Sequence, residues 1–385
     1  MNYELRHDND IVMVLDIGYQ YYVDKVVQIV NNAKIPVGIG ERGPITAREV
    51  DEWLMDRGIP AKREDIEYIL EKENTESVNE LLIKNNCMGL KDHYWLIEEG
   101  SPVRWEDINY FENKERFGKW GDEIYLGRKI EEVADGKTPS SSASGMQPKM
   151  WVIRNNDERW LVKGSEEMTK QEPLSEYAAS LILDKMDIKH VEYILLQDKN
   201  DLLSGCKNML QNHEELISAY YMTRDKKSNN ESHLEHYVRK CADMGLDRND
   251  VRAEMEKMIV VDYLFANTDR HWSNFSIIRS ADTLQGIKLA PLYDHGAAFF
   301  TKVQYYKDIG SVNRNLKCKS FKGFQESNLD HVKNIDWLKR DALREIPDIV
   351  RDAMHQNKGR EERVNEITRN IISRITMFKK RYGLG

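Results

Sequence analysis

Hydrophobic and polar positions follow two different periods along this chain of 385 residues. Near the N-terminus, residues 11–30 combine β-branched and aromatic side chains, which favours short strands. Residues 44–100 then change to helical spacing, where Thr46 and Glu49 match the capping box that opens a helix. A strand-like run at residues 94–97 ends this part. The pattern predicts a small N-terminal unit of strands and helices.

The centre of the chain predicts a second set of strands. Apolar runs at residues 150–153 and 160–163 flank a polar turn, which is a hairpin signal. Pro173 is suited to the first turn of a helix, and residues 191–210 predict two more strands. The stretch at residues 133–149 is rich in Ser, Gly and Pro, which is typical of a flexible linker. A small-residue loop that leads into a hairpin is equally typical of a phosphate-covering loop.

From about residue 231 the spacing of apolar residues is helical. Asn249 or Asp250 is suited to cap one helix, and residues 329–385 predict further amphipathic helices. The expected architecture is therefore α+β, with two lobes and an additional N-terminal part. The boundaries are an accessory region at 1–115, a β-rich N-lobe at 116–210 with a Ser/Gly-rich loop at 138–149, and a helical C-lobe at 211–385.

Composition and charge narrow the functional classes. Hydrophobic residues make up 40% and charged residues 32% of the chain, which excludes a disordered protein. The net charge of −8 at pH 7 gives no bulk support for nucleic-acid binding, which needs clustered Lys and Arg. The four cysteines lack metal-site or disulfide spacing, and no apolar run approaches the roughly 20 residues of a membrane span. A cytoplasmic protein without membrane contact is expected.

The helices followed by a strand within residues 44–100 admit a second interpretation, a winged helix that would bind DNA. The mixed charge of this stretch favours an accessory packing or recognition domain instead. Direct nucleic-acid binding is therefore not expected.

Candidate chemistry begins with Asp269 and Asn274, which lie in a segment that directly follows a long apolar helix. A carboxylate there can accept or orient a hydroxyl proton, and an amide oxygen can reach a metal ion. The same D-x-x-x-x-N spacing occurs in the catalytic loop of protein kinases. His271 lies between the two and is interpreted as a hydrogen-bonding strut rather than a catalyst.

Asp294 makes this pattern more specific. Runs at residues 275–278 and 287–290 predict a hairpin, which would return Asp294 to the side of Asn274. Carboxylate and amide oxygens are the ligands that Mg²⁺ prefers, and phosphoryl transfer needs a metal ion at the phosphates of ATP. The order of loop, hairpin and carboxylate predicts a phosphoryl-transfer site.

Lys163 ends the second strand of the central hairpin and is a candidate phosphate ligand, like the strand lysine of protein kinases. Glu176, on the next predicted helix, is a candidate to pair with Lys163 and hold it in place. Glu172 is a competing candidate for that role.

Together these parts resemble the HipA-like kinases over about residues 135–350. Residues 44–130 also look like the N-terminal part of uncharacterised bacterial and phage-associated proteins of this kind. The motifs that carry the resemblance are, in chain order, Ser142-Ala-Ser-Gly145-Met-Gln147-Pro-Lys149, Val162-Lys163, Ser175-Glu176-Tyr177, Thr268-Asp269-Arg-His271-Trp-Ser-Asn274-Phe275 and Leu292-Tyr-Asp294.

The resemblance implies a two-lobed protein-kinase-like fold that uses ATP and Mg²⁺. It implies Asp269 as the catalytic base, Asn274 and Asp294 as Mg²⁺ ligands, and Lys163 as a phosphate ligand. The loop 142–149 would lie over the phosphates. The further candidate nucleotide-binding residues are Ser144, Gly145, Gln147, Lys149, Glu176 and His271.

In the family that the motifs resemble, a loop serine can be autophosphorylated, which expels the loop and stops ATP binding. Ser142 matches that position, but Ser140, Ser141 and Ser144 lie beside it, so which of them is modified stays open. A phosphoserine carries nearly two negative charges, which would repel the phosphates of ATP.

The sequence therefore predicts an ATP- and Mg²⁺-dependent serine/threonine protein kinase that acts on an unidentified protein substrate. One alternative is a kinase-fold enzyme that modifies a non-protein substrate or transfers AMP. Another is a catalytically silent nucleotide-binding or DNA-associated scaffold. A regulatory or antitoxin-type partner is an open question, since the accessory region does not obviously match the toxin that gives the family its name.

Overall fold

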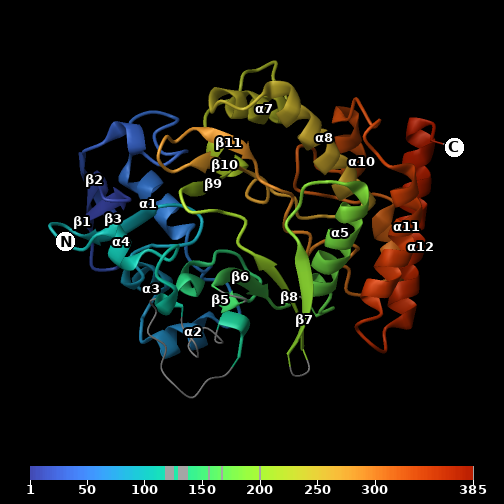
Figure 1. Cartoon of the computed structure of the whole chain (residues 1–385), viewed down its shortest axis with the longest axis horizontal. Coiled ribbons are helices and arrows are strands. Elements are labelled where there is room, and N and C mark those ends of the chain that lie inside the picture. Colours follow the sequence, from blue (N-terminus) through green and yellow to red (C-terminus); the bar gives the residue numbers. More distant parts are fainter. Residues whose placement is uncertain (118–124, 129–137, 155–156, 166–167, 199–200, 385) are drawn as a thin grey trace.

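The computed structural model describes residues 1–117, 125–128, 138–154, 157–165, 168–198 and 201–384. Figure 1 shows the N-terminal strands on the left, strands β5 to β8 at the lower centre and the C-terminal helices on the right. Residues 133–137 of the predicted linker and residues 155–156 of the predicted hairpin turn lie outside the described residues. Within the described residues, none of the helices is long and apolar enough to cross a membrane.

The accessory region contains an antiparallel sheet of four strands, in the order β3-β2-β1-β4. The predicted capping box is confirmed, because Glu49 N donates to Thr46 Oγ1 and Thr46 N donates to Glu49 Oε2, both at 3.2 Å. The strand predicted near residue 94 pairs with β1 as part of this sheet. The elements are β1 (Asn2–His7), β2 (Asp10–Ile17), β3 (Val23–Ile29), α1 (Ala47–Met55), α2 (Ile66–Glu73), α3 (Val78–Lys84), β4 (Tyr94–Glu98) and α4 (Trp105–Ile108).

A second antiparallel sheet, in the order β5-β6-β8-β7, contains the predicted central hairpin. Met150 lies opposite Val162 in the pairing of β5 with β6. The helix α5 packs on β7 and β8 and has Pro173 in its first turn, as predicted. The elements are β5 (Lys149–Arg154), β6 (Glu158–Lys163), α5 (Glu172–Met186), β7 (Tyr193–Asp198) and β8 (Asp201–Lys207).

A third sheet, in the order β11-β10-β9, carries the hairpin that precedes Asp294. The strands β10 (Ser276–Ser280) and β11 (Gly286–Leu289) confirm the predicted hairpin. The strand β9 (Glu214–Ser218) was not predicted from the sequence, and it pairs with β10 across a long stretch of chain. Since β10 directly follows the segment with Asp269 and Asn274, this pairing places β9 beside that segment.

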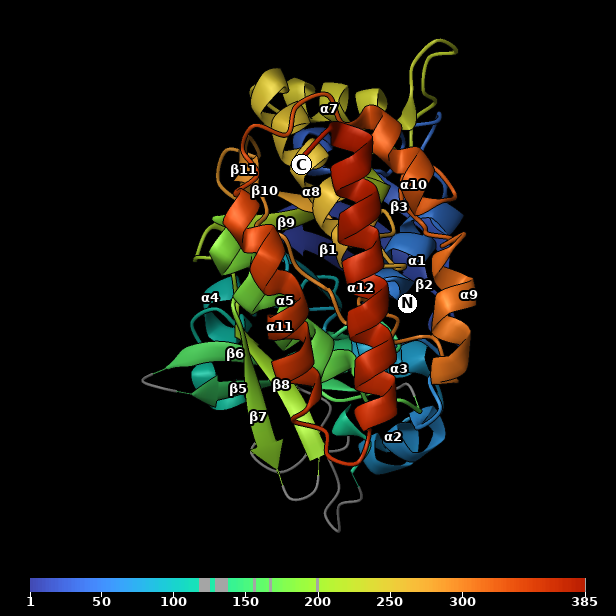
Figure 2. The same ribbon diagram turned by 90° about the vertical axis from the view of Figure 1, so that its right-hand side faces the viewer.

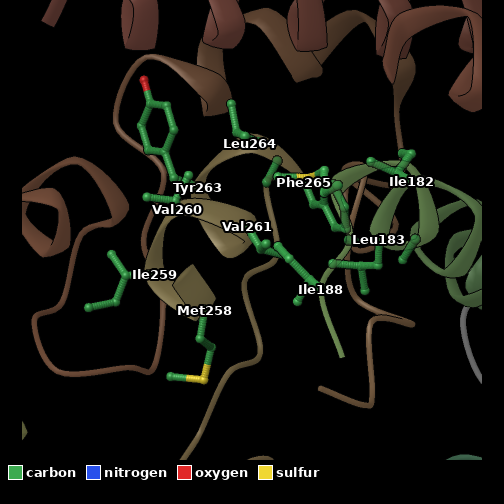
Figure 3. Packing of buried hydrophobic residues seen from close by; sticks show 14 of the residues in the cluster. Ile182, Leu183, Ile188, Met258, Ile259, Val260, Val261, Tyr263, Leu264 and Phe265 are labelled. Atoms are coloured by element: carbon green, nitrogen blue, oxygen red, sulfur yellow. The ribbon is translucent and has the colours of Figure 1, made fainter. Parts of the chain in front are cut away.

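The helical lobe packs around α8, and α11 and α12 lie side by side on its outer face (Figure 2). Val261 and Phe265 lie with Leu183 and Ile188 in one buried apolar cluster (Figure 3). The predicted cap of α8 was wrong by two or three residues: Asp247 is the N-cap, because its Oδ1 accepts from the first free backbone N–H groups of the helix. The helices are α6 (Ala219–Met222), α7 (His233–Asp243), α8 (Arg248–Leu264), α9 (Ile309–Asn313), α10 (Gln325–Asn328), α11 (Arg340–Met354) and α12 (Glu361–Tyr382).

A buried polar network fixes the accessory region to the third sheet. Glu215 on β9 lies 2.9 Å from His7 Nε2 and accepts from Arg279 Nε at 2.7 Å. Arg279 also donates to the hydroxyl of Tyr94 at 3.2 Å. Because buried charges need partners, this network holds β1 and β4 against β9 and β10. The accessory region therefore has a defined position beside the candidate site.

Candidate active site

Lys163 at the end of β6 is the centre of a buried ion-pair cluster. Its Nζ lies 2.7 Å from Glu176 Oε1 and 3.2 Å from Asp294 Oδ1. Burial alone would lower the pKa of Lys163, but Asp294 and Glu176 outweigh it and hold that pKa well above its usual value. Glu176 pairs with Lys163, whereas no ion pair between Lys163 and Glu172 occurs in the described part of the chain.

Glu176 also fixes the segment around Asp294. Its second oxygen, Oε2, accepts a 3.1 Å hydrogen bond from the backbone N of His295. Asp294 adopts a left-handed backbone with φ of 60°, which is uncommon for a residue with a side chain and is typical of constrained functional sites. Burial would raise the pKa of Asp294, but Lys163, Lys149 and Arg270 keep it below its usual value. Asp294 is therefore ionised at neutral pH.

Asp269 and Asn274 lie in the loop between α8 and β10. Asn274 Nδ2 donates to the backbone oxygen of Asp269 at 2.9 Å, which closes the loop and leaves Oδ1 as the other polar atom of the amide. His271 Nδ1 accepts from Ser273 N at 3.2 Å. This bond is consistent with the predicted strut role of His271, although its ring also lines the cleft described below.

Arg270, which was not predicted from the sequence, joins the segment of Asn274 to the segment of Asp294. It is fully buried and makes an ion pair with Asp262 of α8, with Nε 3.0 Å from Oδ2. Its Nη1 donates to the backbone oxygens of Asn274 at 2.7 Å and Tyr293 at 2.6 Å. A buried arginine with this number of acceptors acts as a strut, and the signal in the sequence was its position directly after Asp269.

Two lysines from the segment after Asp294 contact the carboxylate of Asp269. Neither of them was predicted from the sequence. Lys302 Nζ lies 3.1 Å from Oδ2, and Lys319 Nζ lies 2.5 Å from Oδ1. Both lysines are exposed, so these contacts are easily exchanged for others. They place positive charge beside the atom that would receive a hydroxyl proton.

The predicted phosphate loop leads into β5 and is tied to the end of β6. Gln147 Nε2 donates to the backbone oxygen of Gly164 at 2.6 Å. Gly145 has a φ of 107°, and a Cβ there would lie 2.8 Å from Lys149 Nζ, so the turn requires glycine. Lys149 Nζ donates to the backbone oxygen of Ser144 at 2.9 Å. The loop thus has a folded conformation beside the cleft.

Ser142 and Ser144 differ in their surroundings. Ser142 is buried, and its hydroxyl donates to the backbone oxygen of Met88 and accepts from Asn85 Nδ2 at 3.1 Å. Ser144 accepts from Lys91 Nζ and lines the cleft. In this conformation the hydroxyl of Ser142 faces the accessory region rather than the cleft.

Most of the predicted site residues line one cleft of about 1020 Å³. It lies between the accessory region, the phosphate loop and the helical lobe. Ser142 and Glu176 are not among its lining residues, while the other predicted ones are Ser144, Gly145, Gln147, Lys149, Lys163, Asp269, His271, Asn274 and Asp294. The chain therefore brings carboxylates, an amide and lysines together in one concave site, as phosphoryl transfer requires.

The oxygen donors of this cleft suit Mg²⁺. Asp294 supplies an ionised carboxylate and Asn274 supplies an amide whose nitrogen is already engaged by Asp269 O. Mg²⁺ is commonly bound by one or two protein oxygens together with phosphate oxygens and water. The residues present therefore fit the ion.

Comparisons with known proteins agree with this architecture. The model of the HipA-like C-terminal domain matches residues 141–375. A structure of the Shewanella oneidensis MR-1 toxin–antitoxin system, HipA with HipB and operator DNA, matches with a TM-score of 0.56 at 13% identity, over 97% of this chain and 97% of that chain. The Helicobacter pylori proinflammatory kinase CtkA matches with a TM-score of 0.47 at 20% identity, over 60% of this chain and 93% of that chain. No curated protein shows significant similarity.

The fold and the comparisons define a kinase-like protein with two lobes. Because the matched segment covers more than half of the sequence, the chain belongs to the HipA-like family. The resemblance inferred from the motifs is confirmed.

Proposed function

We propose that this chain is an ATP- and Mg²⁺-dependent serine/threonine protein kinase. The observation that carries the proposal is the contact of the buried Lys163 with both Glu176 and Asp294, at 2.7 and 3.2 Å, beside Asp269 and Asn274 in one cleft. A kinase needs a lysine held by a glutamate and a metal-binding aspartate beside it. The family membership supports the same class of activity.

In this proposal Asp269 orients the acceptor hydroxyl. The hydroxyl oxygen forms a bond to the γ-phosphorus, the bond from that phosphorus to the β–γ bridging oxygen breaks, and ADP leaves. The hydroxyl proton passes to the carboxylate of Asp269. Lys302 and Lys319 must yield that carboxylate to the incoming hydroxyl, and their ammonium groups then stand near the charge of the transferred phosphoryl group.

Lys163 would bind the phosphates and Glu176 would keep its ammonium group in place. Asn274 and Asp294 would hold Mg²⁺, which supplies charge neutralisation at the phosphate oxygens when bound. Gly145 and Gln147 shape the loop that covers the phosphates, and the tie from Gln147 to Gly164 keeps this loop close to Lys163.

Autophosphorylation at Ser142 is part of the proposal. The Ser142 hydroxyl is buried against Met88 and Asn85, so it must leave this contact before it can accept a phosphoryl group. A phosphate is larger than a hydroxyl and charged, so a modified Ser142 could not return to the same buried place. The modified loop would then stay away from the cleft.

The test is incubation of the purified chain with γ-labelled ATP and Mg²⁺. Label should appear on the protein or on an added protein substrate, and Asp269→Asn and Asp294→Asn should each abolish it. Asp282→Asn, an exposed residue between β10 and β11, is the matched control and should label like the wild type. Equal labelling of all four proteins would overturn the assignment of the site, and ATP binding without any transfer would favour the scaffold alternative.

A further inference from the structure

We propose that Lys91, a residue of the accessory region, binds the phosphates of the nucleotide together with Lys149 of the phosphate loop. The inference rests on the proposed nucleotide site and adds a ligand from outside the matched segment 141–375. The accessory region would then be part of the nucleotide site rather than a separate appendage.

Lys91 and Lys149 approach the same loop residue from two sides. Lys91 Nζ donates to the side-chain oxygen of Ser144, and Lys149 Nζ donates to its backbone oxygen at 2.9 Å. Both lysines line the cleft that contains Lys163 and Asp294. Two ammonium groups therefore converge at the loop that is proposed to cover the phosphates.

Neither ammonium group has a carboxylate within ion-pair distance among the residues that the structure describes, in contrast to Lys163. Lys91 is an exposed residue that lines the cleft, and desolvation by the surrounding protein lowers its pKa. Burial, followed by the charge of Lys163, lowers the pKa of Lys149 to about 8. Two ammonium groups that meet at Ser144, and that form no ion pair with a carboxylate among the described residues, suit a polyanionic ligand such as a triphosphate.

The backbone of Lys91 is held rigidly, which distinguishes it from an ordinary surface lysine. Its carbonyl accepts a 2.7 Å hydrogen bond from Leu216 N on β9. The next residue, Asp92, makes two hydrogen bonds with Arg57, at 2.7 and 2.8 Å. Arg57 Nε also donates to the backbone oxygen of Cys87 at 2.9 Å. A fixed backbone limits the entropy cost of binding to the ordering of the lysine side chain itself.

The same segment holds the loop at a second position. Asn85 and Met88 contact the hydroxyl of Ser142, so residues 85–91 touch the loop at Ser142 and Ser144. Nucleotide binding would therefore strengthen the attachment of the loop to the accessory region. Release of the loop would remove Ser144, which both lysines contact, from the side of the phosphates.

The experiment compares binding of a non-hydrolysable ATP analogue and of adenosine to the full chain, with adenosine measured by competition. Lys91→Ala should lower the affinity for the analogue by roughly tenfold or more, as expected for loss of one charge-assisted contact. The affinity for adenosine should not change. Lys91→Arg should restore most of the loss. Lys25→Ala on β3, an exposed lysine outside the cleft, should bind both ligands like the wild type.

The outcomes separate this inference from the proposed function. Unchanged analogue binding by Lys91→Ala overturns the inference while leaving the nucleotide site intact. Equal weakening of analogue and adenosine also overturns it, because that pattern means a structural role. A wild-type chain that binds neither ligand overturns both the inference and the proposed function. Thermal unfolding of each variant shows whether a loss of binding comes from misfolding.

Discussion

Arg270 donates a 2.6 Å hydrogen bond to the backbone oxygen of Tyr293, so the residue after Asp269 is bonded directly to the residue before Asp294. This contact links the segment of Asp269, the proposed base, to the segment of Asp294, the proposed Mg²⁺ ligand. It depends on Asp262 of α8, which neutralises the guanidinium inside the core. The site is therefore built on the most buried helix of the lobe.

Replacing Arg270 should disrupt both the fold and the site. Arg270→Lys cannot reproduce the planar set of donors and leaves backbone acceptors and Asp262 unsatisfied. We expect a loss of unfolding free energy of about 3–5 kcal/mol, measured by denaturant titration, as for other broken buried pairs. Arg344→Lys, on the exposed face of α11, is the control and should change stability little. A wild-type stability for Arg270→Lys would show that the strut is not needed.

The pairing of Glu176 with Lys163 predicts a difference between two glutamates of the same helix. Glu176→Gln removes the charge that holds Lys163 and should reduce phosphoryl transfer by about a hundredfold. Glu172→Gln changes a carboxylate that does not pair with Lys163 and should reduce the rate far less. Steady-state rates at saturating ATP make the comparison. Similar losses in both variants would remove the basis for choosing Glu176.

ATP affinity should depend on pH through Lys149. Its pKa of about 8, lowered by burial and by Lys163, means that the ammonium group of the free protein loses its proton as the pH rises through that value. Bound phosphates favour the charged form, so affinity should fall roughly tenfold between about pH 7 and about pH 9. Lys149→Arg stays charged and should flatten the profile. An unchanged slope in that variant would assign the pH dependence to another group.

The buried polar network that holds the accessory region against the third sheet predicts that the stability of the protein depends on pH. Burial opposes a charged His7, but hydrogen bonds to Asp8 and Glu215 outweigh it and raise the pKa of His7 to about 9 from 6.5. A raised pKa contributes stability that is complete below about pH 6.5 and is lost as the pH rises through about 9. His7→Gln should therefore be clearly destabilised in thermal melts at pH 6. The gap to the wild type should narrow above pH 9, and a constant gap would contradict the pKa assignment.

Ser142 predicts a switch in nucleotide affinity. Ser142→Asp places a charge where the hydroxyl now contacts Met88 and Asn85, so the loop should leave its site. We expect at least tenfold weaker ATP binding and faster proteolysis within residues 138–149. Ser142→Ala keeps the small size and should bind ATP nearly as the wild type does. Tight ATP binding by Ser142→Asp would show that the position of the loop does not control the affinity for ATP.

The hairpins and the capped helix could be predicted because their signals are local. Thr46 and Glu49 are three residues apart, and each predicted hairpin joins neighbouring runs. The strand β9 was missed because its partner β10 lies far along the chain. Asp247 was missed as a cap because three neighbouring polar residues compete for that role, and only the backbone geometry decides among them.

In the candidate site, too, residues in local motifs could be predicted and residues placed by distant contacts could not. Asp269, Asn274, Asp294 and Lys163 were found from motif spacing, and the cleft brings them together. Lys302 and Lys319 were not found, because they come from a segment without a periodic pattern. Lys91 was not found because its role depends on how the accessory region packs beside the loop. Contacts between distant segments are set by tertiary packing, which no local pattern encodes.

The central claim, transfer of the γ-phosphoryl group, is tested most directly by two labels in parallel. The wild-type chain is incubated with Mg²⁺ and either γ-labelled or α-labelled ATP, and with a chelator in place of Mg²⁺ as a control. We expect label on serine or threonine from γ-labelled ATP alone, and we expect it to be lost with the chelator and in Asp269→Asn. Incorporation from α-labelled ATP would mean AMP transfer, and incorporation from neither label would contradict kinase activity.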